Sequence, residues 1–132
     1  ANPNICPQGW HVPTEAEWQQ LELALGMPVA ELNSLYIRGD AQNVGGKMKA
    51  NILWTDPNTG ATNESGFSSV PGGYRDNFDG IFYTLGGLGA WWSASESGAE
   101  FAWSRAVIFS DSGIDRQGLG KRLGFSLRCV RD

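Results

Sequence analysis

Glycines, including the pairs Gly72-Gly73 and Gly86-Gly87, interrupt the apolar runs in the middle of this chain. Residues 66–96 read GFSSVPGGYRDNFDGIFYTLGGLGAWWSASE, in which short apolar or aromatic runs alternate with glycines. A long amphipathic helix is excluded here, because helical periodicity does not persist across such interruptions. The pattern instead predicts three short β-strands, around residues 67–70, 81–85 and 90–94, joined by tight turns. A centre of this kind favours a rigid, loop-rich scaffold that can carry a binding surface.

The composition restricts the size of the fold and the partners it can bind. At 132 residues, with 18% charged, the chain is predicted to form a single ligand-binding domain over residues 1–132. Its formal net charge of −4 argues against binding to nucleic acid or anionic membrane. Membrane insertion is not expected, since no apolar run approaches the ~20 residues that cross a bilayer. No signal peptide is visible at the start of the sequence, and we expect this domain to be part of a larger multidomain protein, with Ala1 at the edge of the domain.

The two cysteines lie close to opposite ends of the chain. If Cys6 and Cys129 are paired, they close a loop that contains nearly the whole domain. In the chain-entropy model such a bond contributes about 4–5 kcal/mol to the free energy of unfolding. A disulfide also indicates an oxidising compartment, so the chain would be extracellular or exposed at a cell surface. The alternative is two buried free thiols.

The first helix has the clearest local signal. Thr14 and Glu17 form a capping box, in which each side chain can bond the backbone N–H of the other residue. Trp18 then begins an apolar face, and Gly26 is a typical helix terminator. These features predict a helix over residues 15–25 that packs on the core through Trp18.

The remaining elements are predicted from weaker patterns. A second helix is expected from Pro28 to Gly39. Its apolar face would consist of Val29, Leu32, Leu35 and Tyr36. Residues 55–66 form a long polar loop, and loops of this length in a compact domain are usually functional or held by a ligand.

Strands are expected near both ends of the chain. One strand lies within residues 5–12, another spans residues 101–109, and a closing strand spans residues 124–130. The segment between the last two, residues 110–122, is predicted to be a hairpin-like excursion. Helices first and mainly strands afterwards predict an α+β fold with an antiparallel sheet.

Several segments of the chain, taken in order, resemble one bacterial family. They are CPQGWHVPTEAEW at 6–18, GGKMK at 45–49, ATNESGFSSVPGGYR at 61–75, AWWSASE at 90–96, AWSRAV at 102–107 and GFSLRCVRD at 124–132. Together they resemble the Fibrobacter succinogenes major paralogous domain, a family of extracellular and lipoprotein modules. HVPTEAEW and GFSLR are also similar to the LPTEAEW and GFR segments of formylglycine-generating enzymes.

This resemblance implies a C-type-lectin-like fold. In such a fold the terminal strands pair, two helices flank a small antiparallel sheet, and a long loop region carries ligands. Pairing of Cys6 with Cys129 fits that closure. Oxidase chemistry of the formylglycine-generating type is not expected, because no cysteine lies between these two. The Glu-Pro-Asn, Gln-Pro-Asp and Trp-Asn-Asp segments of calcium-dependent sugar-binding lectins are also missing; the nearest match is Asp56-Pro57-Asn58.

Oxygen-bearing side chains in the polar loop are candidates for a calcium site. The predicted ligands are Asp56, Asn58, Asn63 and Glu64. Calcium prefers carboxylate, amide and backbone oxygens, but the same residue types also form turns. An EF-hand is excluded because its twelfth position is Phe67. A zinc site is not expected with His11 as the single histidine, and we interpret this histidine as structural.

The residues that recognise a ligand should lie between the shared motifs, where members of a family can differ. The candidates are Asp76, Asn77, Asp79, Asp111, Asp115 and Arg116, together with Trp91. The six polar side chains can bind hydroxyl groups, a peptide backbone or a carboxylate. Trp91 and Trp92 must face opposite sides of a strand, so one of them is directed outward. The alternative is a solvated loop surface.

These observations predict a non-catalytic recognition module of a bacterial surface or secreted protein. Like an adhesin, it would bind a short peptide or a glycan on another cell or polymer through its loop region, with calcium as a candidate cofactor. The first alternative is a structural spacer or cap in a larger surface protein. The second is a hydrolase with paired acids such as Glu96 and Glu100, although their spacing does not single them out.

Overall fold

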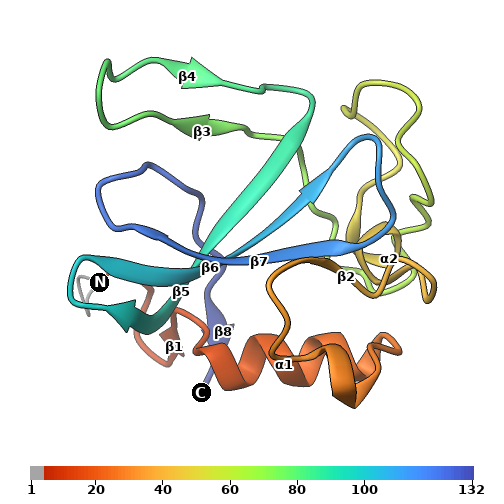
Figure 1. The fold of residues 1–132 in the computed structure, drawn as a ribbon, viewed down its shortest axis with the longest axis horizontal. Coiled ribbons are helices and arrows are strands. Elements are labelled where there is room, and N and C mark those ends of the chain that lie inside the picture. Colours follow the sequence, from red (N-terminus) through yellow and green to blue (C-terminus); the bar gives the residue numbers. More distant parts are fainter. Residues whose placement is uncertain (1–4) are drawn as a thin grey trace.

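An antiparallel four-stranded sheet forms the centre of the computed structural model, which describes residues 5–132. Its strand order is β2 (Tyr36–Arg38), β7 (Ile114–Gly120), β6 (Phe101–Ile108) and β5 (Leu88–Gly98). Helix α1 (Glu15–Ala24) lies along one face of this sheet, and the hairpin of β3 (Tyr74–Arg75) and β4 (Phe82–Tyr83) lies on the other side (Figure 1). The predicted α+β class with antiparallel strands is confirmed, and the sheet is more extensive than expected.

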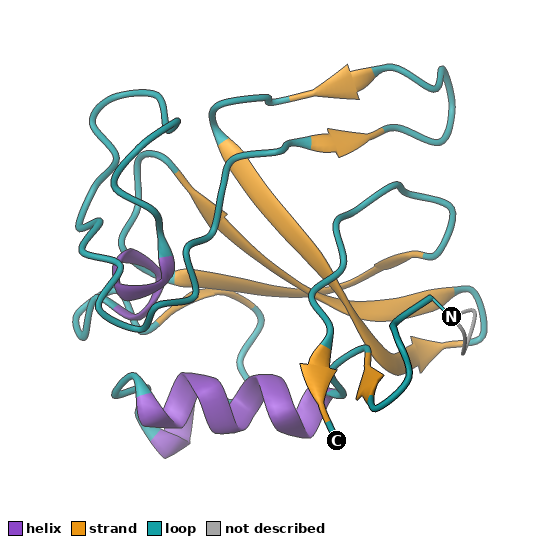
Figure 2. Cartoon of the chain, turned by 180° about the vertical axis from the view of Figure 1, so that it is seen from behind, coloured by secondary structure: helices purple, strands orange, loops and turns teal. Residues whose placement is uncertain are grey.

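The two ends of the chain are held side by side. Strand β1 (Trp10–His11) pairs antiparallel with β8 (Val130–Arg131) in a separate two-stranded sheet next to the start of α1 (Figure 2). Beside this pair, Cys6 and Cys129 form a disulfide with their Cα atoms 5.9 Å apart. The predicted pairing of terminal strands and cysteines is therefore confirmed, and the alternative of two free thiols is wrong.

Helix α1 forms as its sequence predicts. The Thr14 hydroxyl accepts a hydrogen bond from the Glu17 N–H, and the Glu17 carboxylate accepts one from the Thr14 N–H (2.8 Å). Trp18 is 2% exposed and begins the main hydrophobic core. The buried members of that core are Trp18, Met27, Leu32, Val44, Met48, Trp54, Trp91, Val107 and Ile114. The capping box thus defines the start of α1, and Trp18 and Leu21 place one face of the helix in the core.

The predicted second helix is wrong. Only a 3-10 turn, η1 (Val29–Glu31), forms in this segment, and the chain then enters strand β2. Pairing with β7 and burial of Arg38 hold residues 36–38 in the sheet. The actual second helix is α2 (Val44–Met48), whose N–H at Gly46 donates to the Ser112 carbonyl. A Cβ on Gly45 would lie 1.8 Å from the Gly113 carbonyl oxygen, so only glycine permits this close approach.

Two of the predicted strands are also revised. Residues 67–70 form a loop with a single bridge between Ser69 and Lys49. Residues 110–122 contain β7, a central strand paired on both sides, where a hairpin-like excursion was expected. The closing strand is shorter than predicted and consists of β8 alone, preceded by bridges at Gly124 and Ser126. The other expected strands correspond to β4, β5 and β6, but β5 has 11 residues and is longer than the short strand expected around residues 90–94.

A buried chain of ion pairs joins α1 to the sheet. Glu22 accepts hydrogen bonds from Arg38 and from Arg105 (2.6 Å to Nε). Glu15 accepts from Arg105 (2.9 and 3.0 Å) and from Arg116 (2.6 Å). The three arginines lie on β2, β6 and β7, so two carboxylates of one helix fix three strands. Burial raises the pKa of Glu15, but the hydrogen bonds and charges of Arg105 and Arg116 outweigh it and hold that pKa below its ordinary value.

None of the helices in the described part of the chain is long and apolar enough to cross a membrane. The longest helix there is α1, with 10 residues.

Candidate functional site

The face of the four-stranded sheet that points away from α1 has small side chains. Along β6, Arg105 and Val107 are buried toward the helix, so Ser104 and Ala106 occupy the opposite face. Ala90 on β5 lies directly across from Ala106. These short side chains leave space above the sheet and form the floor of a cavity of about 440 Å³.

We call this cavity the sheet groove. It is lined by Tyr74, Asp76, Asn77, Phe78, Leu88, Ala90, Ser104, Ala106, Asp115, Gln117, Leu119, Leu123 and Phe125. Its walls come from the β3–β4 hairpin and from the loop that follows β7 (Figure 1). The Tyr74 ring meets Phe125 edge to face at 6.2 Å and stacks on Tyr83 at 5.8 Å. Aromatic faces and small floor residues together make a concave site of the kind that binds small ligands.

Hydrogen-bonding side chains line the same groove. Asp115 accepts a hydrogen bond from Gln117 on one oxygen (2.6 Å), and Asp76 accepts one from the Phe78 N–H (2.7 Å). The second oxygen of each carboxylate has no hydrogen-bond partner among residues 5–132. Within that range the Asn77 side chain is also free of hydrogen bonds, and it is exposed. The groove thus presents unused acceptors and an amide to a ligand.

Three of the seven predicted ligand residues meet in the sheet groove: Asp76, Asn77 and Asp115. Sequence reasoning missed Gln117, Tyr74 and Phe125. Gln117 follows Asp115 by two residues on β7 and would have been found if residues 114–120 had been recognised as a strand. The aromatic walls come from segments about 50 residues apart, so no local pattern indicates them.

The comparison with protein families gives a match over residues 1–131, to the Fibrobacter succinogenes major domain. The chain belongs to this family. The family name inferred from the sequence motifs is therefore confirmed. Searches of curated proteins and of solved structures find no match for the chain.

Four predicted ligand residues of this Fibrobacter succinogenes major domain lie elsewhere. Trp91 is 6% exposed in the core, and Arg116 is buried between Glu15 and the Trp103 ring, 3.7 Å from its centroid. Both side chains are used internally, so their assignment to a ligand site is corrected. It is Trp92 that leaves the core, and it stacks on Phe125 at 4.6 Å.

The other two are turn residues outside the sheet groove. Asp111 accepts a hydrogen bond from the Gly113 N–H (2.7 Å). Asp79 accepts from the Tyr83 hydroxyl (2.6 Å) and the Ile81 N–H (2.8 Å), and these bonds lower the pKa of its carboxyl group. Their carboxylates stabilise local turns in this structure.

The proposed calcium ligands of the Fibrobacter succinogenes major domain lie in the polar loop at residues 55–66. The Asn63 side-chain amide donates to the Ser68 hydroxyl and accepts from the Ser68 N–H. The Glu64 carboxylate lies 3.8 Å from the Lys47 ammonium. In the part of the chain that the structure describes, no three His, Cys, Asp or Glu side chains gather around one point. These contacts are those of turn residues, and calcium binding by Asp56, Asn58, Asn63 and Glu64 stays a prediction.

The acid pair considered for hydrolysis receives no support from its surroundings. Glu96 is paired with Lys121, and this hydrogen bond lowers the pKa of the Glu96 carboxyl group. A general acid needs a raised pKa, so the shift has the wrong direction. Glu100 is exposed. The absence of catalysis stays a prediction.

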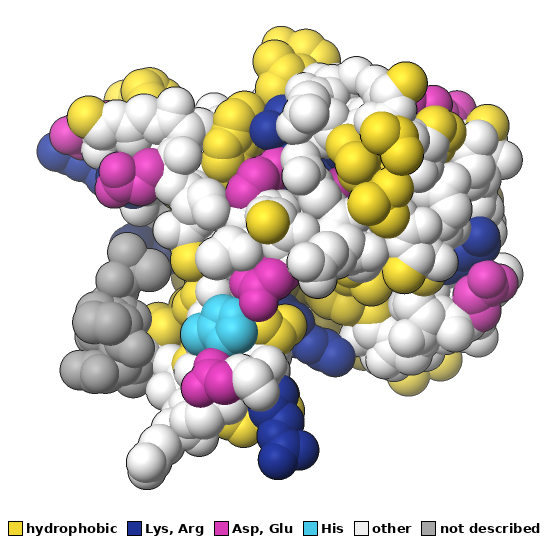
Figure 3. Space-filling view, turned by 90° about the horizontal axis from the view of Figure 1, so that it is seen from below, with side chains coloured by type: hydrophobic (Ala, Val, Ile, Leu, Met, Phe, Trp, Pro, Cys, Tyr) yellow, Lys and Arg dark blue, Asp and Glu magenta, His cyan; other side chains and the backbone are white. Residues whose placement is uncertain are grey.

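The single histidine of this family member links the chain ends. His11 lies between Glu17 (2.7 Å from Nε2) and Asp132 (2.6 Å from Nδ1), and the space-filling view shows the histidine flanked by acidic side chains (Figure 3). The hydrogen bonds to Asp132 and Glu17 raise the pKa of the His11 imidazole above its ordinary 6.5. This supports the structural interpretation made from the sequence.

Protonation of His11 should therefore stabilise the fold. Because the folded pKa lies above the unfolded value of 6.5, this contribution is complete below pH 6.5 and is lost as the pH rises through the folded pKa. We expect the melting temperature of the wild type to exceed that of His11→Asn by more at about pH 5.5 than at about pH 8.5. Calorimetric scans at the two pH values test this. An equal or reversed difference would contradict the assigned ion pairs.

Proposed function

We propose that this domain is a non-catalytic glycan-recognition module and that the sheet groove is its binding site. The observation that carries the proposal is the combination of an acceptor-rich rim with aromatic walls over a floor of small residues. Sugar rings carry many hydroxyl donors on an otherwise apolar ring, so they need both features in one cavity. A volume of about 440 Å³ is within the range of small-ligand sites.

The charge of the lining favours a glycan over a peptide. Two carboxylates and two amides line the groove, and no lysine, arginine or histidine does. A peptide with a free carboxylate or acidic side chains would be repelled by Asp76 and Asp115. Hydroxyl groups can donate to the free oxygen of each carboxylate and accept from the amides of Asn77 and Gln117.

The proposal includes the setting of the domain. The Cys6–Cys129 disulfide supports an oxidising location, at the cell surface or outside the cell. In such a location an adhesin-like module of a larger protein would hold a glycan on another cell or polymer. We also propose that the fold is related to C-type lectins, as the paired terminal strands and the loop-borne groove suggest, and that calcium is an optional cofactor.

A glycan array tests the proposal. Labelled wild-type domain should bind a limited set of neutral glycans, and Asn77→Ala and Asp115→Asn should each weaken binding about tenfold or more, corresponding to ~1.4 kcal/mol. Glu100→Gln is the matched control, since this exposed carboxylate lies outside the sheet groove, and it should bind like the wild type. Parallel arrays with calcium and with a chelator show whether the ion takes part.

Two outcomes would overturn the proposal. Binding to a peptide array with silence on the glycan array would reassign the ligand class. Silence on both arrays, with the wild type folded, would favour the structural spacer. Melting curves of every variant confirm that a loss of binding is not a loss of folding.

A further inference from the structure

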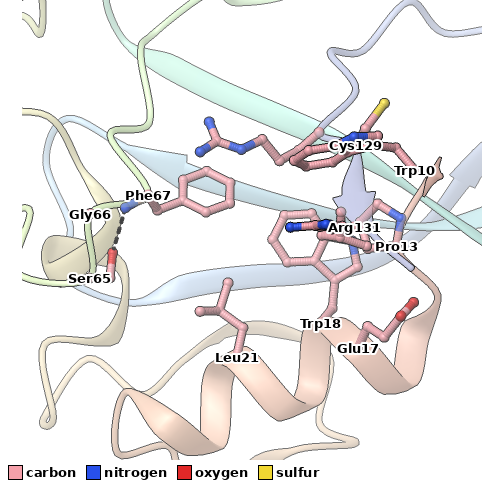
Figure 4. Close-up of a pocket in the computed structure, with 12 residues that line it drawn as sticks. Trp10, Pro13, Glu17, Trp18, Leu21, Ser65, Gly66, Phe67, Cys129 and Arg131 are labelled. Carbon is pink, nitrogen blue, oxygen red and sulfur yellow. Dashed lines mark hydrogen bonds between the residues drawn. The ribbon is translucent and has the colours of Figure 1, made fainter. Parts of the chain in front are cut away.

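A second cavity lies on the opposite side of the sheet, where the clamped chain ends meet α1. We call it the helix groove; its volume is about 430 Å³. It is lined by Trp10, Pro13, Glu17, Trp18, Leu21, Ser65, Gly66, Phe67, Arg128, Cys129, Val130 and Arg131. Figure 4 shows Trp18 and Leu21 rising from α1 and Phe67 entering from the loop on the other side. None of these residues takes part in the sheet groove.

The helix groove has an exposed apolar surface. The Trp10 side chain is 45% exposed and lies on β1, directly across the strand pair from Arg131. The Phe67 ring packs against the Trp18 ring, with their centroids 5.9 Å apart, and Phe67 is partly exposed. These rings and Leu21 offer an apolar pocket to a large side chain.

Two arginines in the groove have no acidic partner in the part of the chain that the structure describes. The Arg128 guanidinium lies over the Phe67 ring, 4.6 Å from its centroid, and neither Arg128 nor Arg131 has a carboxylate within 4.0 Å. The one carboxylate in the lining, Glu17, is already bonded to His11 (2.7 Å) and to the Thr14 N–H (2.8 Å). In a chain with a net charge of −4, this groove presents unpaired positive charge beside aromatic rings.

The disulfide fixes the position of these charges. Cys129 lies between Arg128 and Val130, it is bonded to Cys6, and β8 pairs with β1 at the next residues. The backbone that carries both arginines is therefore held in place before any ligand arrives, which lowers the entropy cost of binding.

We propose that the helix groove binds a carboxylate attached to a large apolar group, as found at the C-terminus of a peptide that ends in a bulky apolar residue. Arginine forms two parallel hydrogen bonds to a carboxylate, and the neighbouring rings of Trp10 and Phe67 would cover the apolar side chain. This site is independent of the proposed glycan groove, which has the opposite charge and lies on the other face of the sheet.

A matched pair of small probes tests the site. N-acetyl-L-phenylalanine carries the free carboxylate, and N-acetyl-L-phenylalanine amide has the same shape without the charge. A ligand of this small size should bind weakly, so we expect a Kd on the order of 1 mM for the acid. We expect NMR titration of the ¹⁵N-labelled, disulfide-bonded domain to move the indole N–H signal of Trp10, with binding of the amide at least tenfold weaker.

Variants locate the charge that is responsible. Arg128→Gln and Arg131→Gln should each weaken binding of the acid several-fold, and Arg122→Gln, an exposed arginine outside the groove, should leave it unchanged. Equal binding of acid and amide, shifts confined to residues outside the groove, or no shift at about 20 mM probe would each overturn the proposal. Equal binding of glucuronate, a carboxylate without an apolar side chain, would contradict the proposed contact between the aromatic rings and an apolar group of the ligand.

Discussion

Replacing Lys49 by methionine should lower the free energy of unfolding by about 3 kcal/mol, although the two side chains are similar in length. Lys49 is 0% exposed, and its ammonium donates to the carbonyls of Thr59 (2.7 Å), Ile108 (2.9 Å) and Asp111 (2.8 Å). Burial lowers the pKa of this amine to about 8, so it is still charged at neutral pH. Methionine would leave three inward-facing carbonyls without a donor, at about 1–3 kcal/mol for each one that water does not reach.

Chemical denaturation of the two proteins at neutral pH measures this loss. Lys47→Met is the matched control, because Lys47 is two residues away, is partly exposed and has a single carbonyl acceptor in Leu25 (2.8 Å). The free energy of unfolding of Lys47→Met should be lower than that of the wild type by no more than about 1 kcal/mol. Equal losses for the two variants would mean that Lys49 does not hold the 55–66 loop and β6 together.

Glu22→Gln should be at least as damaging, with an expected loss of about 3–5 kcal/mol. The substitution keeps the shape of the side chain but removes the carboxylate paired with Arg38 and one of the two carboxylates paired with Arg105, and both arginines are buried. A buried guanidinium without its carboxylate cannot recover its hydration, and it cannot lose its proton at neutral pH. The loss should therefore appear as a much lower denaturation midpoint.

The matched control for Glu22 is Glu64→Gln on the surface. Glu64 is exposed, and its carboxylate is 3.8 Å from Lys47, so this substitution should change the free energy of unfolding by less than about 0.5 kcal/mol. If Glu22→Gln were as mild as Glu64→Gln, the ion-pair chain would not be what attaches α1 to the sheet.

Local signals predicted the elements that local contacts determine. The capping box of Thr14 and Glu17 defines the start of α1 without help from the rest of the chain. The predicted second helix failed because its apolar spacing does not reflect burial: Val29, Leu35 and Tyr36 are exposed. Contacts between distant residues determine the structure of this segment instead. Arg38 donates a hydrogen bond to Glu22, and β2 pairs antiparallel with β7.

The candidate site shows the same division. Asp76, Asn77 and Asp115 were predicted from their position between motifs, and the fold brings them into one groove. Arg116 was misassigned because its partner, Glu15, is 101 residues away in the sequence. Strand alternation predicts that Trp91 and Trp92 face opposite sides of the sheet. Which of the two faces the core depends on packing against α1, which the sequence alone does not show.

Chemical-shift mapping of the strongest glycan from the array is the most direct test of the central claim. On titration into the ¹⁵N-labelled domain, we expect the largest shifts at the amides of Tyr74, Asn77, Asp115, Gln117 and Phe125, which come from three separate segments and meet only in the sheet groove. Signals of the helix groove, such as the Trp10 indole, should not move. Shifts centred on the 55–66 loop or on the helix groove would place glycan recognition elsewhere and contradict the proposed site.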